Sequence, residues 1–248
     1  MIFAASTAAT IIGCVSMSSM HEMAMPGGWT MSMAWMRMPG QTWVGASTSF
    51  VSMWIAMMVA MMLPVLVPML RRYRNAACYT GMRGSNGWAA LVAAGYFLAW
   101  TLLGIAIFPI GSAFATLAMK SPALARGVPI ATGVIVLFAG ALQLSGWKAH
   151  LLTCCRGATA CGSTLRTDAV TAWRLGLRLG LRCIGCCAPL TAILLALGVM
   201  DPDAMAIVTV AIIAERLAPN GARVARSIGW VAVATGAVLI VRAVAPLA

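Results

Sequence analysis

Six side chains that can bind a soft metal ion are grouped in two short segments of the chain. They are His150, Cys154 and Cys155 in the first segment and Cys183, Cys186 and Cys187 in the second. If the segments are helical, Cys183 shares a face with Cys186 and Cys187, and His150 shares one with Cys154. Thiolate and imidazole are ligands of Cu(I) and Zn(II). The two segments therefore predict one thiol-rich metal site, provided that the fold brings them together.

Two other interpretations of these cysteines stay open. Cys183 and Cys186 form a CxxC pair, the spacing used for thiol–disulfide exchange, which would make the protein a membrane oxidoreductase. Cysteine is also a small apolar residue that packs within helices. Packing alone suits Cys14 and Cys78, which stand apart from the other thiols.

A polar segment near the N-terminus is rich in methionine. From Met17 to Met38 the chain contains eight methionines and one histidine, and the ligands that we expect among them are Met20, His21, Met23 and Met25. Thioethers with an imidazole can enclose Cu(I) or Ag(I), and a short polar loop offers methionine no core to fill. The alternative is a segment that packs against lipid headgroups beside its tryptophans.

The methionine pattern continues into an apolar segment. Met53, Met57 and Met61 are spaced by four and share one helix face, and Met58 and Met62 form a second pair beside them. Such a face could pass a soft cation into the membrane. Methionine also packs between helices as well as leucine does, so the same pattern suits a structural role.

The composition is that of a membrane protein. Hydrophobic residues make up 62% of the chain and charged residues 9%, whereas about a quarter are charged in soluble domains. Seven segments are candidate spans, at about 2–17, 49–70, 88–110, 128–147, 183–200, 204–217 and 228–244. We therefore expect an all-α, polytopic transmembrane helical bundle, with six spans if the first segment does not cross. Basic loops explain the net charge of +12, so the expected partner is the lipid bilayer and not nucleic acid.

The basic residues are distributed unevenly between the predicted loops. Threading the spans alternately places 13 of the 17 on one side and leaves four on the other, Arg37, Lys120, Arg126 and Arg242. The positive-inside rule assigns the larger group to the cytoplasm. In a bacterial inner membrane the methionine segment and the C-terminus would then face the periplasm, and the cysteines would lie at the cytoplasmic side.

The chain divides into two predicted parts. Residues 1–48 hold the weak first span and the Met-rich outer loop, and residues 49–248 form a six-helix membrane domain with a cytoplasmic Cys/Arg loop at 148–182. Three arginines in that loop are spaced by four, at Arg174, Arg178 and Arg182. They predict a helix along the membrane interface, with Gly176 and Gly180 as small residues that permit close packing.

No catalytic residue set is apparent. The sequence has no phosphate-binding glycine loop, no Ser-His-Asp set and no carboxylate pair, and enzymatic activity is left open. Glu215 is the acidic residue nearest the interior of a predicted span. We expect it to form an ion pair with Arg216 or with the basic loop.

Six motifs resemble a known family. They lie, in order, at 53–64, 95–100, 143–156, 173–187, 198–200 and 215–219. Together they resemble the domain-of-unknown-function 2182 family, described as predicted metal-binding integral membrane proteins. Three positions depart from its pattern, since Leu179, Arg182 and Ala188 stand where the family tends to have His, Tyr and Trp. The resemblance implies a membrane protein that binds metal, and it implies no established reaction.

These features predict a protein that handles a soft metal ion, with Cu(I) as the first candidate and zinc as the second. The outer methionine segment would capture the ion, the methionine face would pass it on, and the thiols would receive it. This would serve transport, or delivery to a membrane or periplasmic metalloprotein partner. The remaining alternative is a non-catalytic assembly or structural subunit of a membrane complex, in which the sulfur serves packing.

Overall fold

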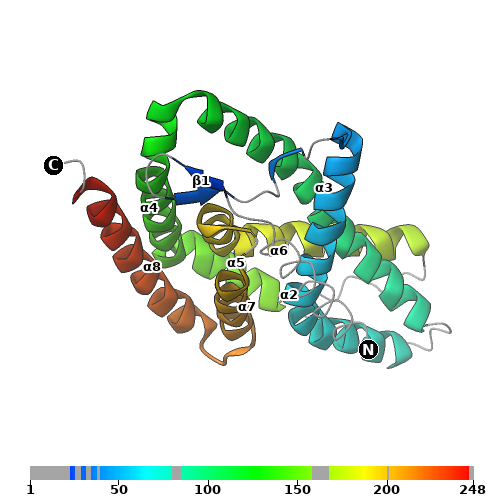
Figure 1. Cartoon of the computed structure of the whole chain (residues 1–248). Helices are drawn as coiled ribbons and strands as arrows, with labels where there is room; N and C mark the ends of the chain where they lie inside the picture. The colour runs from blue at the N-terminus through cyan, green and yellow to red at the C-terminus, as the bar shows by residue number, and fades with distance from the viewer. Residues whose placement is uncertain are drawn as a thin grey trace.

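The computed structural model describes residues 23–25, 29–31, 35–37, 40–79, 85–157, 168–199 and 201–245. Within these ranges the protein consists of seven helices and one antiparallel two-stranded hairpin (Figure 1). The helices are α2 (Trp43–Tyr79), α3 (Ser85–Lys120), α4 (Pro122–Leu144), α5 (Gly146–Gly157), α6 (Ala169–Leu197), α7 (Pro202–Leu217) and α8 (Gly221–Val244). The strands are β1 (Met23–Met25) and β2 (Trp29–Met31). The predicted all-α class is confirmed.

Five of these helices are long and apolar enough to cross a membrane, namely α2, α3, α4, α6 and α8. The sixth predicted span corresponds to α7, which has 16 residues and is shorter than the roughly 20 that a crossing needs. The predicted first span at 2–17 lies outside the described residues.

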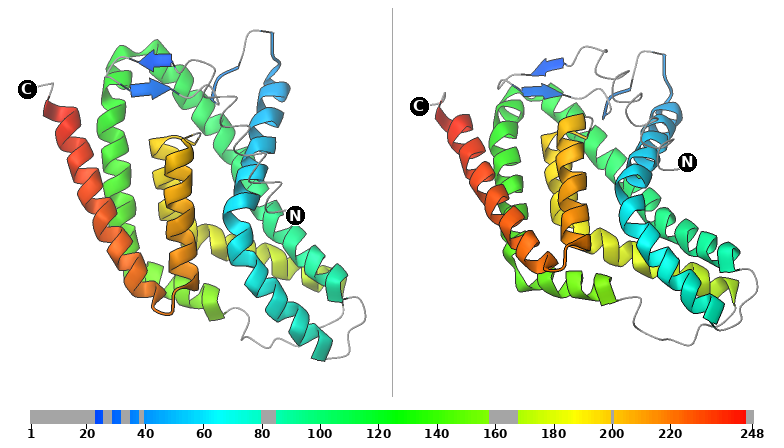
Figure 2. Two further views of the ribbon diagram at one scale, coloured as in Figure 1. Left: turned by 60° about the horizontal axis from the view of Figure 1, so that its bottom comes forward. Right: turned by 90° about the horizontal axis from the view of Figure 1, so that it is seen from below.

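The helices differ from the predicted spans mainly at their ends. The predicted interfacial helix and the predicted fifth span form one continuous helix, α6, which runs through the neighbouring residues Arg182 and Cys183 without a break. Within α6, Pro189 is a residue type that kinks helices, and the helix changes direction along its length (Figure 2). The predicted fourth span is divided at Ser145, whose backbone N–H bonds to the Leu142 carbonyl and ends α4.

Glycines bring α3 and α6 into close contact. A Cβ atom at Gly180 would lie 2.8 Å from the Tyr96 carbonyl oxygen, and one at Gly95 would lie 2.7 Å from the Trp173 carbonyl oxygen. The close packing predicted for Gly176 and Gly180 is therefore confirmed. Because Gly180 lies one turn before the CIGCC segment, this contact also brings Tyr96 to the cysteines.

The methionine face of α2 lies inside the main apolar core. Met57, Met58, Met61 and Met62 are each at most 3% exposed, whereas Met53 is half-buried. Beside them, the indole N–H of Trp54 donates to the Trp100 carbonyl at 2.9 Å. This burial fits the packing role of the pattern, and the role in passing a metal ion stays a prediction.

The hairpin formed by β1 and β2 and the helix α5 lie at opposite ends of the bundle. The strands cover the corner between α3 and α4, while α5, the end of α2 and the connection from α7 to α8 lie at the other end (Figure 2). The Trp29 indole N–H donates to the Ala125 carbonyl at 2.8 Å and ties the hairpin to α4. The two sulfur-rich regions are therefore separated along the length of the helices.

Candidate metal centre

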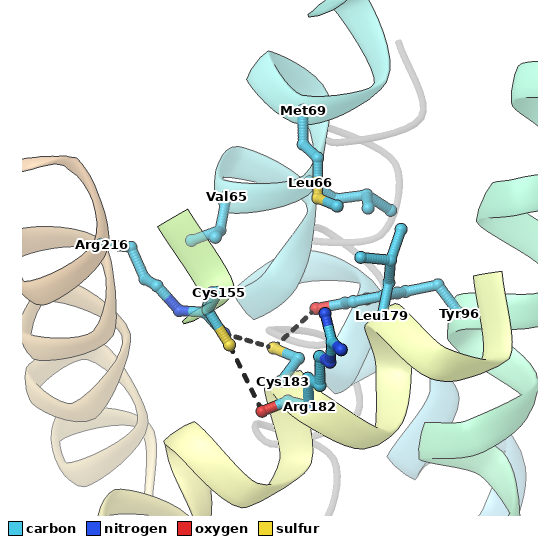
Figure 3. Close-up of a pocket in the computed structure, with 9 residues that line it drawn as sticks. All are labelled: Val65, Leu66, Met69, Tyr96, Cys155, Leu179, Arg182, Cys183 and Arg216. Atoms are coloured by element: carbon cyan, nitrogen blue, oxygen red, sulfur yellow. Dashed lines mark hydrogen bonds between the residues drawn. The ribbon is translucent and has the colours of Figure 1, made fainter. Parts of the chain in front are cut away.

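A small cavity of about 20 Å³ lies where α2, α3, α5, α6 and α7 converge (Figure 3). Its lining includes three soft-ligand side chains, Met69, Cys155 and Cys183, and two cationic ones, Arg182 and Arg216. This volume suits one water molecule or one ion. The two segments that sequence analysis singled out thus meet, because α5 supplies Cys155 and α6 supplies Cys183.

Cys183 has three polar groups around its sulfur atom. The Tyr96 hydroxyl donates to Cys183 Sγ at 2.9 Å, and the guanidinium group of Arg216 donates at 3.0 Å (Figure 3). The sulfur atoms of Cys183 and Cys187 lie 3.8 Å apart. Both cysteines are at most 3% exposed. A phenol and a guanidinium group thus both donate to one buried sulfur, and such donors can compensate part of the charge that a metal-binding thiolate carries.

Cys155 forms the second thiol pair of the centre, with Cys186. A hydrogen bond with the Cys186 side chain and the charges of Arg216 and Arg182 lower the pKa of the Cys155 thiol from 9.0 to about 6, and partial burial opposes this shift. Cys155 Sγ also lies 3.4 Å from the Arg182 carbonyl oxygen. Two thiol pairs, Cys155 with Cys186 and Cys183 with Cys187, therefore lie around Arg216.

A buried ion pair lies next to the backbone of the cysteine segment in α6. Lys148 Nζ lies 2.8 Å from Glu215 Oε2 and donates to the Cys186 carbonyl at 2.6 Å. The Gln143 amide donates to Glu215 Oε1 at 2.5 Å, and all three side chains are at most 2% exposed. The carboxylate thus bonds with residues that sequence analysis placed at the end of the fourth span and the start of the basic loop, which confirms the second of its two expected pairings.

The contacts of Lys148 and Gln143 with Glu215 were not predicted from the sequence. Lys148 was counted only among the cytoplasmic charges, and Gln143 only as part of a motif. For Lys148 the available signal was its distance of seven residues from Cys155, which places both on one face of α5. Gln143 lies on α4, before the break at Ser145, and no such spacing relates it to the cysteines. What the spacing could not show is that Glu215, some 70 positions away, is their partner.

His150 and Cys154 lie apart from the cavity lining. Their Nε2 and Sγ atoms are 3.5 Å apart on α5, where His150 is exposed and Cys154 is half-buried. Helix geometry explains this, because neighbouring residues point about 100° apart, so Cys154 turns away where Cys155 turns in. Of the five expected thiols, Cys155 and Cys183 therefore line the cavity. Cys187 lies beside Cys183, Cys186 interacts with Cys155, and Cys154 lies outside the lining with His150.

The methionines of the outer segment are only partly described. Met20 and His21 lie outside the described residues, and Met23 is described only as part of β1. Met25 is 8% exposed and packs with Ala115 and Ala118 in a small second core. The expectation that this segment has no core to fill is wrong for Met25, because the corner between α3 and α4 provides one.

Met69 is a further soft ligand that the spacing did not single out. It lies in the C-terminal half of α2 and lines the cavity with Cys155 and Cys183. Its distance of seven residues from Met62 places both on one helix face, which is the signal that could have identified it.

Over the described part of the chain, no group of three or more His, Cys, Asp or Glu side chains is arranged to hold a metal ion.

The fold and the site together define a class of protein, an all-helical bundle of membrane-length apolar helices with a buried thiol centre. The chain belongs to the PpoB2 family, described as a copper chaperone, because the model of that family matches residues 51–239. The matched region contains every thiol of the centre, and it confirms the predicted connection with copper. No curated protein and no solved structure matches the chain.

Proposed function

We propose that this protein is a membrane-embedded copper chaperone that holds Cu(I) between buried cysteines and delivers it to a metalloprotein partner. The observation that carries the proposal is the environment of Cys183, whose sulfur lies 3.8 Å from that of Cys187 and 3.0 Å from the Arg216 guanidinium group. Membership of a copper chaperone family supports copper as the cargo.

The spacing of Cys183 and Cys187 suits one bound ion. Metal–thiolate bonds are about 2.3 Å long, so two of them can span sulfur atoms up to about 4.6 Å apart. The observed separation is 3.8 Å, so both sulfurs can bind one ion without a change in α6. Cu(I) is a soft ion that thiolate ligands select.

A route from the outer segment to the thiols follows α2. The face that begins at Met53 and continues through Met57 and Met61 runs toward the end of the helix where Met69 lines the cavity. Capture at Met20, His21, Met23 and Met25 would precede this step. The proposed direction also uses the predicted topology, in which the thirteen basic residues lie in the cytoplasm and the methionine segment in the periplasm.

The geometry disfavours the thiol–disulfide oxidoreductase that the CxxC spacing suggested. The sulfur nearest to Cys183 belongs to Cys187, at 3.8 Å, and the Cys186 side chain pairs with Cys155. A disulfide between Cys183 and Cys186 would need an S–S bond of about 2.05 Å and would break both pairs.

Metal analysis of three purified proteins tests the proposal. The detergent-solubilised full chain, its Cys183→Ser/Cys187→Ser variant and its Cys154→Ser variant are loaded with Cu(I) under reducing conditions, washed and analysed for copper and protein. We expect bound copper in the wild type and in Cys154→Ser, because Cys154 lies outside the cavity, and a loss of most of it in the double variant. Equal copper in all three proteins would refute the proposed site.

Delivery is tested in a second step. Copper-loaded protein in liposomes is mixed with one of a series of water-soluble Cu(I) chelators that differ in affinity. The rate of copper release is then compared for the wild type and Met69→Leu. A slower release from the variant supports Met69 as an exit or entry ligand. Equal rates would remove Met69 from the route.

A further inference from the structure

The helix α5 has a buried face and an exposed face, and each carries a side chain that can bind a soft ion. Lys148 and Leu152 are at most 2% exposed, and Cys155 lines the cavity with them on the buried face (Figure 3). His150 is exposed on the other face, and Cys154 is half-buried at the boundary between the two faces. The cavity thiol Cys155 and the pair of His150 and Cys154 are therefore neighbours on one helix.

His150 and Cys154 are placed to bind one metal ion together. They lie four residues apart, about one helical turn, and the His150 Nε2 and Cys154 Sγ atoms are 3.5 Å apart. With the bond lengths known for zinc, about 2.3 Å to sulfur and about 2.0 Å to nitrogen, one ion can reach two such atoms up to about 4.3 Å apart. The observed distance is shorter, so one ion can bind both atoms without a change in α5.

The same geometry leaves the rest of the coordination sphere open. Because the two atoms are closer than the sum of the two bonds, the two ligands would lie on one side of the ion. In the described part of the chain, no group of three or more His, Cys, Asp or Glu side chains includes this pair. Metal sites with an open position admit a further ligand, whereas closed sites are structural. An ion bound by the pair is therefore accessible to a ligand from another molecule.

We propose that His150 and Cys154 form a second, open metal site, from which Cu(I) passes to the metalloprotein partner. The inference rests on the proposed function, because the thiols of the cavity supply the ion. In the transfer, one cavity sulfur releases the ion and takes up a proton, while Cys154 loses a proton and forms a metal–sulfur bond. A ring nitrogen of His150 forms the second bond, and copper stays Cu(I) throughout. The partner that fits this site presents thiol, thioether or imidazole ligands of its own.

Protection of Cys154 from alkylation tests whether the pair binds metal. The detergent-solubilised full chain is titrated with Ag(I), a redox-stable substitute for Cu(I), and alkylation of Cys154 by iodoacetamide at fixed pH is followed by tandem mass spectrometry. We expect His150→Gln to raise the Ag(I) concentration that half-protects Cys154 at least about tenfold, because the thiol loses a second ligand held close to it. Thr153→Ala is the matched control, since it changes an exposed side chain beside Cys154 and leaves that concentration unchanged.

Release kinetics test whether the ion leaves the protein through the pair. The wild type and His150→Gln are loaded with Cu(I) and washed, and transfer of copper to the chelator bathocuproine disulfonate is timed. Washing removes an ion that only two accessible ligands hold, so both proteins keep the copper of the cavity. We expect the variant to release this copper several-fold more slowly. For the same reason Cys154→Ser keeps its copper content after washing and releases the ion more slowly.

Two results would overturn the inference. One is an equal Ag(I) concentration for half-protection in the wild type and His150→Gln, or no protection in either, because the imidazole would then not bind the ion. The other is an equal release rate, because the ion would then leave by another route. Failure of the proposed function is distinct, since Cys183→Ser/Cys187→Ser would then hold as much copper after washing as the wild type, and protection of Cys154 by Ag(I) does not depend on that result.

Discussion

Among the described residues, the buried methionines of α2 and the buried cysteines of α6 differ in their neighbours, because buried charged side chains lie beside the cysteines and not beside the methionines. Four methionines of α2 lie in an apolar core, at Met57, Met58, Met61 and Met62. Among the described residues, the buried side chains of Lys148 and Glu215 lie at the thiol end instead. There Lys148 donates to the Cys186 carbonyl, and Arg216 donates to Cys183.

This difference follows from the chemistry of the two sulfur ligands. A thioether is neutral whether or not it holds a metal, so it packs in an apolar core like any methionine. A thiolate carries a negative charge, and burying it is unfavourable without a nearby cation or donor. Soft ligands can therefore line a helix such as α2 without charged neighbours, whereas the thiol end needs an electrostatic framework.

The largest expected effect comes from removing the charge framework at the thiol end. Glu215→Ala leaves Lys148 buried without a carboxylate, and we expect it to lower the free energy of unfolding by about 3–5 kcal/mol. Unfolding in mixed detergent micelles measures this loss. The control is Lys148→Met/Glu215→Leu, which removes both charges and should lose less than the single change. A double variant as unstable as Glu215→Ala would show that the ion pair is not the cause.

A smaller effect is expected at the helix contact that positions Tyr96. Gly180→Ala places a Cβ atom where the Tyr96 carbonyl oxygen is 2.8 Å away, so α3 and α6 must separate. We expect a loss of stability of about 1–3 kcal/mol, typical of overpacking, together with weaker Ag(I) binding. Gly185→Ala is the control, because a Cβ atom there meets its nearest neighbour at an ordinary 3.7 Å. Equal stability and equal Ag(I) binding in Gly180→Ala and Gly185→Ala would show that this helix contact does not position Tyr96.

At the methionine end the expected change in stability is smaller still. Met57→Leu/Met61→Leu conserves side-chain volume in the core and should cost less than about 1.5 kcal/mol. If these methionines only pack in the core, the variant in liposomes loads copper onto the cysteines at the wild-type rate. If they bind the ion on its way to the cysteines, the variant loads more slowly but reaches the same final copper content. Loading kinetics thus separate the two roles that the spacing left open.

The weakest effect concerns the protonation of Cys155 in the metal-free protein. The pKa of this thiol is lowered from 9.0 to about 6, so its thiolate persists above about pH 6 and is lost as the pH falls below it. We expect the iodoacetamide alkylation rate assigned to Cys155 by peptide mass spectrometry to be half-maximal near pH 6. A midpoint near pH 9 would contradict the proposed interactions with Cys186 and Arg216.

Much of the fold could be predicted from the sequence, because apolar length and helix periodicity are local properties. The helices α2, α3, α4, α6 and α8 and the face formed by Met57 and Met61 were identified in this way. Ends were less accurate, since the sequence divided α6 where the basic segment meets the apolar one, and the helix continues through Arg182 and Cys183. The strands β1 and β2 were missed because the segment is polar and short, and the corner between α3 and α4 that they cover is a tertiary feature.

For the candidate site, the sequence singled out the cysteines but could not show their arrangement, and their role as ligands stays a prediction. The spacing of Cys183, Cys186 and Cys187 indicated a shared helix face, and the cavity brings Cys183 together with Cys155. Spacing could not show that Cys154 turns outward or that Arg216 and Tyr96 donate to one sulfur. These contacts join residues from four helices, and they depend on how the helices pack.

The most direct test of the central claim is X-ray absorption spectroscopy at the copper edge of the loaded protein. If Cys183 and Cys187 hold the ion, the wild-type spectrum shows Cu(I) with two sulfur neighbours, and Cys183→Ser/Cys187→Ser loses this signal while Cys154→Ser keeps it. A copper environment of nitrogen and oxygen alone, or a sulfur signal that survives in the double variant, would contradict the account.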